Sequence, residues 1–307
     1  MATYVARRLL QAVLVLLGVS VLVFSMIYLL PGDPVLTMLG DQVVAAEVVE
    51  NARHQLGLDQ PAPVQYGRFL WRALQGDLGR SWRSNQAVTA TILEQLPATL
   101  QLTVCGLGLA VVLGVVLGVI AAVRQNSLAD SFSMFLALIG VSMPSFWLGL
   151  LLIYFFSLRL GWIPATGYGG GKRLILPAFT LGLQASAIIA RLVRSSVLEV
   201  LRQEYITTAR AKGLAEWRVL VGHALRNALI PVVTVVGLQF GGLLGGAVII
   251  ETVFARQGIG RVAVVAITGK DFPMVQGIVL FVAAVYVLVN LAVDLLYAWL
   301  DPRIRYS

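Results

Sequence analysis

The chain has 307 residues, of which 58% are hydrophobic and 12% charged, and its formal net charge is +8. Soluble domains carry about 25% charged residues, so this composition excludes a globular protein that faces water on all sides and indicates a polytopic membrane protein. The basic residues are spread over many short segments, which argues against a nucleic-acid partner, and the single cysteine, Cys105, excludes a disulfide within the chain.

Six runs without a charged residue have a length that suits or approaches a membrane span, for which about 20 apolar residues suffice. They cover residues 9–30, 95–123, 131–158, 174–190, 227–250 and 272–293. The first run follows Arg7 and Arg8, but its 22 residues exceed the roughly 7–15 of a signal peptide, so we expect a retained helix. The fourth run is short, and we expect it to continue through Arg191 and Arg194 to the cytosolic surface.

Lys and Arg residues in short flanking segments set the orientation of such a chain. With the N-terminus inside, the inner segments carry 12 of these residues and the outer segments 11. Five of the outer ones lie in residues 31–94, a segment long enough for its charge to have little influence, which also holds seven acidic residues. Without this segment, the inner segments carry 12 Lys and Arg residues and the outer segments carry 6. Both termini and residues 199–226 are therefore expected in the cytosol.

Three connecting segments, residues 31–94, 159–173 and 251–271, are expected on the other side of the membrane. Residues 31–94 contain the turn signals PGDP and DQPAP and the amphipathic stretch AAEVVENARHQLG, which predicts a small extracytoplasmic subdomain. The Gly- and Pro-rich residues 159–173 predict irregular structure. Their GGGK sequence lacks the G-x-x-x-x-G-K-[ST] spacing of a phosphate-binding loop, so we assign it no nucleotide.

Small residues recur at helical spacing inside the spans. Gly114 and Gly118 form one G-x-x-x-G pattern, and Gly237, Gly241 and Gly245 form an overlapping pair. This spacing lets helix backbones approach closely, so it favours packing between helices. A glycine-lined path for a substrate is compatible with the same pattern.

Pro144 lies inside the third run, within GVSMPSFW. A proline removes one helical hydrogen bond, so we expect a kink or an unwound turn there. With Ser142 and Ser145 beside it, this break is either part of a gate or pore lining or a tolerated structural kink.

The central parts of the spans hold no carboxylate, histidine or basic residue; their main amide side chains are Gln101, Gln184, Gln239 and Asn290. Ion-coupled carriers usually place an ionisable group there. The sequence also lacks a metal-ligand cluster and a nucleophile–base arrangement. We therefore expect no catalytic residue, metal or cofactor in this chain, and any uphill transport has to draw its energy from another protein.

The most unusual stretch is EYITTARAKGLAEWRVLVGHALRNALIP at residues 204–231, which is charged and lies between two apolar runs. It is helix-compatible up to Gly213, which turns the chain, and it then continues helically toward Pro231. An apolar set at i, i+3, i+6 and i+7 predicts one shared face, formed by Leu214, Trp217, Leu220 and Val221. Such a helix either docks into a groove on a partner or lies at the membrane surface with its Arg residues on lipid phosphates.

The segment resembles the cytosolic EAA loop of the permeases of type I ABC importers, in the form of the dipeptide and oligopeptide subfamily. There E-Y-I-x-x-A-R-A-K-G precedes H-x-L-R-N-A-x-x-P-V-V. This chain has Glu204-Tyr205-Ile206, Ala209-Arg210-Ala211-Lys212-Gly213, His223, Leu225-Arg226-Asn227-Ala228 and Pro231-Val232-Val233 at those positions. It departs from the general permease pattern at Thr207-Thr208-Ala209, where Glu-Ala-Ala is usual.

Further motifs along nearly the whole chain fit the same family. They are PGDP at 31–34, QLGLDQP at 55–61, GDLGRS at 76–81, LPATLQL at 96–102, RSSVLEVL at 194–201 and NLAVDLLYAWLDPRIR at 290–305. The resemblance implies an all-α membrane protein with six transmembrane helices in the type I ABC importer permease fold. It divides the chain into a first helix (1–30), an extracytoplasmic subdomain (31–94), a five-helix transmembrane domain (95–298) with a coupling loop at about 199–228, and a cytosolic tail (299–307).

The resemblance also implies which residues carry function. Those expected to dock on an ATPase are Glu204, Tyr205, Ala209, Arg210, Ala211, Lys212, Gly213, Leu214, Trp217 and Arg226. For the substrate pathway the hypothesis names Ser142, Pro144, Gln184 and Gln239.

The implied assembly is an importer in a bacterial plasma membrane. Its other members are a second homologous permease subunit, two cytosolic ATPase subunits that use ATP and Mg, and an extracytoplasmic substrate-binding protein. The chain itself contacts membrane lipid and hydrolyses nothing. Dipeptides or oligopeptides are the expected substrates, with a nickel chelate or glutathione as alternatives within the same plan. A channel or ion-driven carrier with an incidental charged loop is the alternative from another class.

Overall fold

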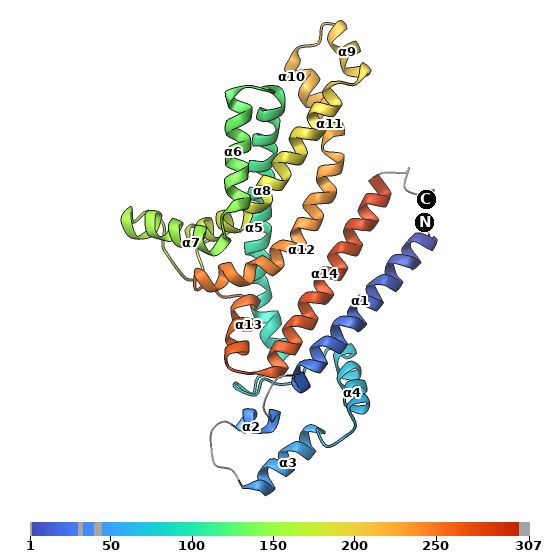
Figure 1. Ribbon diagram of the computed structural model, residues 1–307, viewed down its shortest axis with the longest axis vertical. Helices are drawn as coiled ribbons and strands as arrows, with labels where there is room; N and C mark the ends of the chain where they lie inside the picture. Colours follow the sequence, from blue (N-terminus) through green and yellow to red (C-terminus); the bar gives the residue numbers. More distant parts are fainter. Residues whose placement is uncertain (1, 30–32, 40–44, 301–307) are drawn as a thin grey trace. The chain divides into compact units, whose positions relative to one another are not determined.

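The computed structural model describes residues 2–29, 33–39 and 45–300, and apart from one isolated bridge between Arg80 and Ala87 the regular structure in these ranges is helical (Figure 1). The chain forms two compact units, residues 1–97 with 258–288 and residues 98–257 with 289–307. The boundaries of these units differ from the predicted division at residues 30, 94 and 298. That division stays a prediction. Part of the PGDP motif and most of the predicted tail, residues 301–307, lie outside the described residues.

Within the described residues five helices are long and apolar enough to cross a membrane. They are α1 (Ala2–Leu29), α5 (Val88–Val123), α8 (Lys172–Leu201), α12 (Ile230–Val253) and α14 (Phe272–Leu300). The predicted continuation of the fourth span through Arg191 and Arg194 is confirmed by α8. The helix that contains the second apolar run begins before it, because α5 starts at Val88 and carries the exposed Glu94 within its first turns.

The third predicted span consists of two helices with a break between them. α6 (Leu128–Ser142) and α7 (Ser145–Leu152), which continues as the π-helix η1 (Ile153–Arg159), meet at an angle of 106°. Pro144 directly precedes α7 and, as a proline, has no N–H to donate to a continuous helix. Its backbone is extended, with a ψ of 131°, so the chain changes direction there. The break predicted at Pro144 is confirmed, and with this bent pair the candidate spans number up to six.

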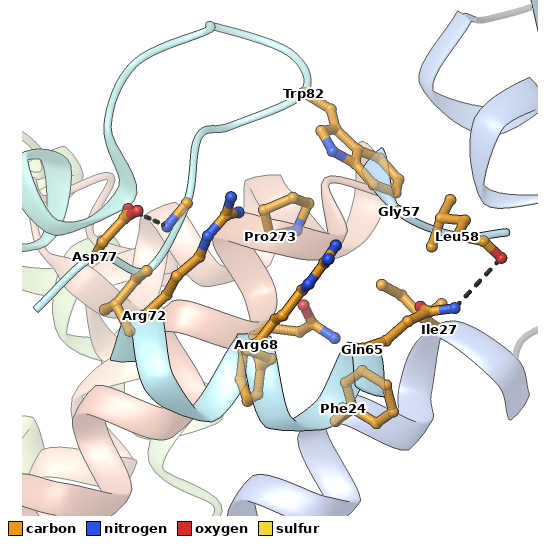
Figure 2. Close-up of a pocket in the computed structure, with 14 residues that line it drawn as sticks. Phe24, Ile27, Gly57, Leu58, Gln65, Arg68, Arg72, Asp77, Trp82 and Pro273 are labelled. Atoms are coloured by element: carbon orange, nitrogen blue, oxygen red, sulfur yellow. Dashed lines mark hydrogen bonds between the residues drawn. The ribbon is translucent and has the colours of Figure 1, made fainter. Parts of the chain in front are cut away.

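The first unit combines α1, the three short helices after it, the first turns of α5, α13 (Ile259–Thr268) and the beginning of α14. The short helices are α2 (Pro34–Leu39), α3 (Ala46–Leu56) and α4 (Ala62–Leu74). Its core is built from Val88, Ile92, Ile259, Ala266, Met274, Val275 and Ile278. α4 packs on α1, where the hydroxyls of Tyr66 and Ser20 are 2.8 Å apart. A pocket remains between α4, α1 and α14 in this unit (Figure 2).

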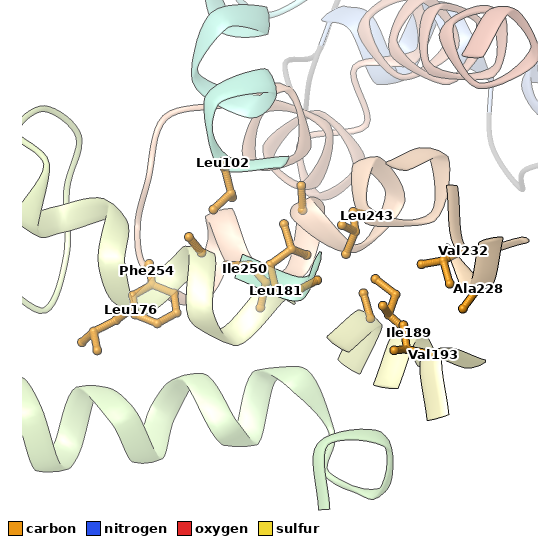
Figure 3. Packing of buried hydrophobic residues seen from close by; sticks show 14 of the residues in the cluster. Leu102, Leu176, Leu181, Ile189, Val193, Ala228, Val232, Leu243, Ile250 and Phe254 are labelled. Atoms are coloured by element: carbon orange, nitrogen blue, oxygen red, sulfur yellow. The ribbon is translucent and has the colours of Figure 1, made fainter. Parts of the chain in front are cut away.

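The second unit is built around α8, which is the most buried of the candidate spans. Side chains from α5, α8, α12 and the turn after α12 form one continuous apolar cluster; it includes Leu102, Leu176, Leu181, Ile189, Val193, Val232, Leu243, Ile250 and Phe254 (Figure 3). A Cβ added at Gly114 would lie 2.7 Å from Ile189, and one at Gly118 would lie 2.6 Å from the carbonyl of Ala190. The predicted packing role of this G-x-x-x-G pattern is therefore confirmed.

The second glycine pattern, on α12, is divided between two environments. A Cβ at Gly237 would lie 2.4 Å from the Val293 side chain, so this position needs glycine for close packing against α14. A Cβ at Gly245 would meet nothing within 4 Å. Only part of this pattern thus serves packing within the chain.

Candidate functional site

The charged stretch folds into a compact turn of short helices at one end of α8 and α12 (Figure 1). We call residues 204–228 the coupling segment; it comprises α9 (Glu204–Ala211), α10 (Glu216–Arg218), the π-helix η2 (Val219–Ala224) and α11 (Leu225–Ala228). Its interior is a small cluster of its own, formed by Ile206, Ala209, Val219 and Ala224. Leu201 at the end of α8 packs against this cluster, so the segment is attached directly to a membrane helix.

Gly213 makes the turn between the two halves of the coupling segment. Its φ of +77° lies in the left-handed region, which glycine adopts without the steric cost that a Cβ brings. A Cβ there would meet no atom within 4 Å, so the requirement for glycine comes from the backbone conformation and not from crowding. The turn predicted at Gly213 is confirmed.

The apolar face predicted for Leu214, Trp217, Leu220 and Val221 is wrong. Leu214 and Leu220 pack against the inner cluster, whereas Trp217 and Val221 are 63% and 57% exposed. The helix begins only at Glu216, and in η2 the N–H of Leu225 reaches the carbonyl of Leu220, five residues back. This wider turn changes the angle between successive side chains, so the 3.6-residue spacing does not hold. The outward apolar surface is therefore centred on Trp217.

Charged, polar and aromatic side chains form three contacts on the outside of the segment. Arg210 binds Glu216 through Nε at 2.7 Å and so bridges the turn at Gly213. Arg218 lies over the Trp217 ring with its guanidinium carbon 5.3 Å from the ring centroid. The Tyr205 hydroxyl accepts a hydrogen bond from Asn227 at 2.8 Å, which joins the first and last parts of the segment.

Most of the residues predicted to dock are at the surface, and one is not. The exposed ones are Glu204, Tyr205, Arg210, Ala211, Lys212, Gly213, Trp217 and Arg226. Ala209 is buried in the inner cluster, so its side chain packs within the segment and its docking role stays a prediction. Leu214 is half-buried against the same cluster. These two residues shape the segment from within.

An ion pair that the sequence did not reveal joins α6 to α8. Arg194 donates to both carboxylate oxygens of Asp130, through Nε and Nη2, at 2.7 Å each. Asp130 is buried and also accepts the N–H of Asn126 at 3.0 Å. Such a two-pronged contact fixes geometry as well as charge. The only available signal was a carboxylate one residue before an apolar run, which does not identify its partner.

A cavity of about 270 Å³ lies between α6, α7, α8 and α12. Two of the predicted pathway residues, Gln184 and Gln239, line it from facing helices, together with Ser145, Gly242 and Gly246. The other two predicted residues, Ser142 and Pro144, are exposed at the break beside it and are not part of its lining. The cavity thus offers two amide groups and a hydroxyl in an otherwise apolar surface, which suits a ligand that both donates and accepts hydrogen bonds.

At the far end of α12, polar side chains form a second set of contacts that the sequence did not predict. Thr99 donates to the Glu251 carboxylate at 2.6 Å, and Arg256 donates through Nη2 to Gln101 at 2.8 Å. The Arg256 guanidinium lies 4.9 Å from the Tyr168 ring centroid. We call these five residues the buried polar network after its buried members Thr99, Glu251 and Arg256; Gln101 and Tyr168 are exposed. Burial lowers the pKa of Arg256, while Tyr168 and Glu251 act in the opposite direction.

The comparisons with known proteins cover the full chain. The family model described as "Binding-protein-dependent transport system inner membrane component" matches residues 114–306, and the model for the N-terminal part of such membrane components matches residues 1–103. The coupling segment and the cavity both lie within the first match.

Curated relatives match over the whole length of both chains. The dipeptide transport system permease protein DppB of Alkalihalophilus pseudofirmus is 44% identical over 334 residues, with 100% of each chain covered. A putative peptide transport system permease protein of Brucella abortus is 45% identical over 315 residues, and the glutathione transport system permease protein GsiC of Pectobacterium atrosepticum is 46% identical over 307 residues, again with full coverage.

Among solved structures, the inward-facing MetNI methionine ABC transporter resembles the fold. One of its crystal forms gives a TM-score of 0.58 at 22% identity, covering 69% of this chain and 96% of the matched chain. At this identity the likeness concerns the fold alone.

Proposed function

The chain belongs to the family of inner membrane components of binding-protein-dependent transport systems, and from this premise we propose that it forms half of the translocation path of an ATP-driven importer of short peptides. In such an assembly the chain is the permease, and ATP and Mg are bound by two partner ATPase subunits. A second, homologous permease subunit completes the path as a heterodimer.

The coupling segment is the observation that carries this proposal. Trp217 and Val221 present an exposed apolar surface surrounded by charges, on a turn whose interior packs against the end of α8. A rigid helical turn with an exposed aromatic residue suits docking into a groove of a partner protein. Because the segment is attached to both α8 and α12, a movement of the ATPase is transmitted to the helices that line the cavity.

The cavity between α6, α7, α8 and α12 supplies the path in this proposal. Peptide bonds carry one donor and one acceptor each, and the amides of Gln184 and Gln239 match both. Their uncharged character allows passage of peptides that differ in side chains. The break at Pro144 lies next to the cavity and permits α7 to change its angle to α6.

Orientation is part of the proposal, with both termini and the coupling segment in the cytosol and residues 31–94 facing the binding protein. After replacement of Cys105, a single cysteine at Gln60 should react with an impermeant thiol reagent from outside, and one at Glu216 should not. The reverse labelling pattern would contradict this orientation.

Substrate choice rests on the relatives. Dipeptide and peptide permeases and a glutathione permease match at nearly equal identity, and glutathione is itself a tripeptide, so short peptides are the chemistry these relatives share. Uptake by the reconstituted complex should be measured with a dipeptide, with glutathione and with a nickel chelate. Uptake of the nickel chelate alone would replace the peptide assignment, and ion-driven uptake without ATP would replace the importer assignment.

Gly213→Val tests the role of the coupling segment. A β-branched residue strains the left-handed backbone at this position, so Arg210 and Trp217 should be displaced. We expect normal membrane insertion, loss of peptide uptake and weaker substrate-stimulated ATP hydrolysis in the reconstituted complex. Glu204→Lys should have a milder effect, because it changes only the charge at an exposed site.

Gly222→Val is the matched control. Gly222 is also exposed in the coupling segment and also has no atom within 4 Å of an added Cβ, but its φ is not in the left-handed region. It should retain most of the uptake. Wild-type uptake by Gly213→Val, with the ATPase still co-purifying, would count against docking and favour a helix that merely lies on lipid.

A further inference from the structure

The pocket in the first unit lies where two candidate membrane spans end. It has a volume of about 240 Å³ and is lined by Phe24 and Ile27 near the end of α1 and by Pro273 and Gln276 at the start of α14. Since both helices are apolar enough to cross a bilayer, these residues lie close to the level where hydrocarbon gives way to head groups. Trp82, an aromatic residue of the kind enriched at that level, lines the pocket as well.

Two arginines bring positive charge to this pocket. Arg68 and Arg72 are one turn apart on α4, and Figure 2 shows both side chains extending from the same side of the helix. Neither guanidinium forms a hydrogen bond or an ion pair with any residue that the structure describes. A Cβ added at Gly57 would lie 3.3 Å from Nη1 of Arg68, so this glycine leaves space for the guanidinium.

One carboxylate lies in the same pocket without neutralising it. Asp77 is among the lining residues, and its Oδ1 accepts the backbone N–H of Gly79 at 2.9 Å. Two guanidinium groups against one carboxylate leave an excess of positive charge. The remaining polar groups include the amides of Gln65 and Gln276. This combination favours an anion that accepts several hydrogen bonds.

The outer surface of α4 is apolar beside these arginines. Val64, Trp71 and Leu74 are exposed, the last two at 64% and 75%, while Tyr66 and Phe69 pack toward Phe24 of α1. A helix with an exposed Trp and Leu stripe beside Arg residues is typical of one that lies in the head-group layer of a membrane. The apolar stripe and the location at the span ends together favour lipid as the surroundings of the pocket.

We propose that this pocket binds the phosphate of an anionic membrane lipid, with Arg68 and Arg72 as its ligands and the acyl chains lying along α1 and α4. The volume agrees with a head group, because sites for whole small-molecule ligands measure roughly 300–1,000 Å³. Bound lipid would hold α4 at the membrane surface and so fix the base of the extracytoplasmic subdomain.

The test uses the full importer complex reconstituted in bilayers of equal parts phosphatidylglycerol and phosphatidylcholine. Lipids that remain bound after gentle purification are counted by mass spectrometry. We expect phosphatidylglycerol to be enriched on the wild type, with about a tenfold loss of affinity for Arg72→Gln, which corresponds to about 1.4 kcal/mol. The Arg68→Gln/Arg72→Gln double variant should lose the enrichment, and the Arg68→Lys/Arg72→Lys variant should keep part of it, which excludes misfolding as the cause.

Arg80→Gln is the matched control, because Arg80 is exposed in the same unit but outside the pocket and donates to the carbonyl of Asn85. It should leave lipid binding unchanged. Equal losses for Arg80→Gln and Arg72→Gln would overturn the proposal in favour of nonspecific surface charge. Displacement of phosphatidylglycerol by excess inorganic phosphate would identify a free-phosphate site, and displacement by a dipeptide would identify a site for a soluble carboxylate; either result also overturns it.

Discussion

Two arginines lie over aromatic rings near the two ends of α12, in opposite surroundings. Arg218 precedes the helix, is exposed, and covers Trp217 at 5.3 Å. Arg256 follows it, is 1% exposed, and covers Tyr168 at 4.9 Å. The distances to the rings are similar, but Arg256 is buried and also donates a hydrogen bond to Gln101, so the two sites differ in burial and in polar partners.

The two surroundings suit two different tasks. In the coupling segment the charges stay in water, where an ion pair or a cation–π contact contributes little and is easily exchanged for a contact with a partner. In the buried polar network the charges have left water, so each is stable only while its partners remain in place. The first arrangement suits a surface that binds another protein, and the second holds the irregular residues 160–171 against α5 and α12.

Exchange of each arginine for methionine should give the largest difference between the two regions. Arg256→Met removes a buried positive charge near the buried Glu251, so the free energy of unfolding should fall by about 3 kcal/mol. Arg218→Met should change it by less than about 0.5 kcal/mol, because the side chain is exposed. Thermal unfolding of the purified complex measures both. Equal losses would mean that burial does not separate the two sites.

The fold was largely predictable from the sequence, because membrane spans are local features. Five of the six apolar runs lie mainly in one helix each, and the run 131–158 forms the bent pair of α6 and α7. Pro144 and Gly213 act through their own backbone, so the effect of each could be predicted from a single position. The start of α5 could not be read from its apolar run, because an exposed charge such as Glu94 ends an apolar run without ending a helix.

The contacts of the candidate sites were less predictable. Thr99 and Glu251 are 152 residues apart, and Asp130 and Arg194 are 64 residues apart, so no local pattern relates them. The apolar face predicted over residues 214–221 does not form, because α10 begins only at Glu216 and a π-helix follows it, which helical periodicity does not include. Gln184 and Gln239 were singled out because polar side chains are rare in the spans, but only the packing of α8 and α12 brings them to one cavity.

Loss of one hydroxyl in the buried polar network should have an intermediate effect. Thr99→Val keeps the shape of the side chain but removes the donor to Glu251, and a hydrogen bond to a charged group is worth about 1.5–3 kcal/mol. We expect the free energy of unfolding to fall by about 2 kcal/mol. The measurement is again thermal unfolding of the complex.

Thr103→Val is the control for this prediction. Thr103 lies one turn further along α5, is also fully buried, and donates to the neutral backbone carbonyl of Thr99 at 2.9 Å. That carbonyl keeps its helical hydrogen bond, so the loss should stay below about 1 kcal/mol. If the two valine variants are equally destabilised, the charge on Glu251 contributes nothing to the difference.

The smallest effect is expected for the ion pair across the Gly213 turn. Arg210 and Glu216 are 2.7 Å apart, but their side chains are 43% and 68% exposed. Water and salt screen such a pair, so a double-mutant cycle with Arg210→Gln and Glu216→Gln should give a coupling energy of about 0.5 kcal/mol or less. That value should decrease further as the salt concentration rises.

Exchanging the two charges by Arg210→Glu with Glu216→Arg should restore stability while uptake stays impaired, because the turn is kept but the partner meets the wrong charges. A coupling energy above about 1.5 kcal/mol, insensitive to salt, would show that the pair is held rigidly like the buried polar network. The coupling segment would then be a fixed structural element, and the contrast between the two ends of α12 would disappear.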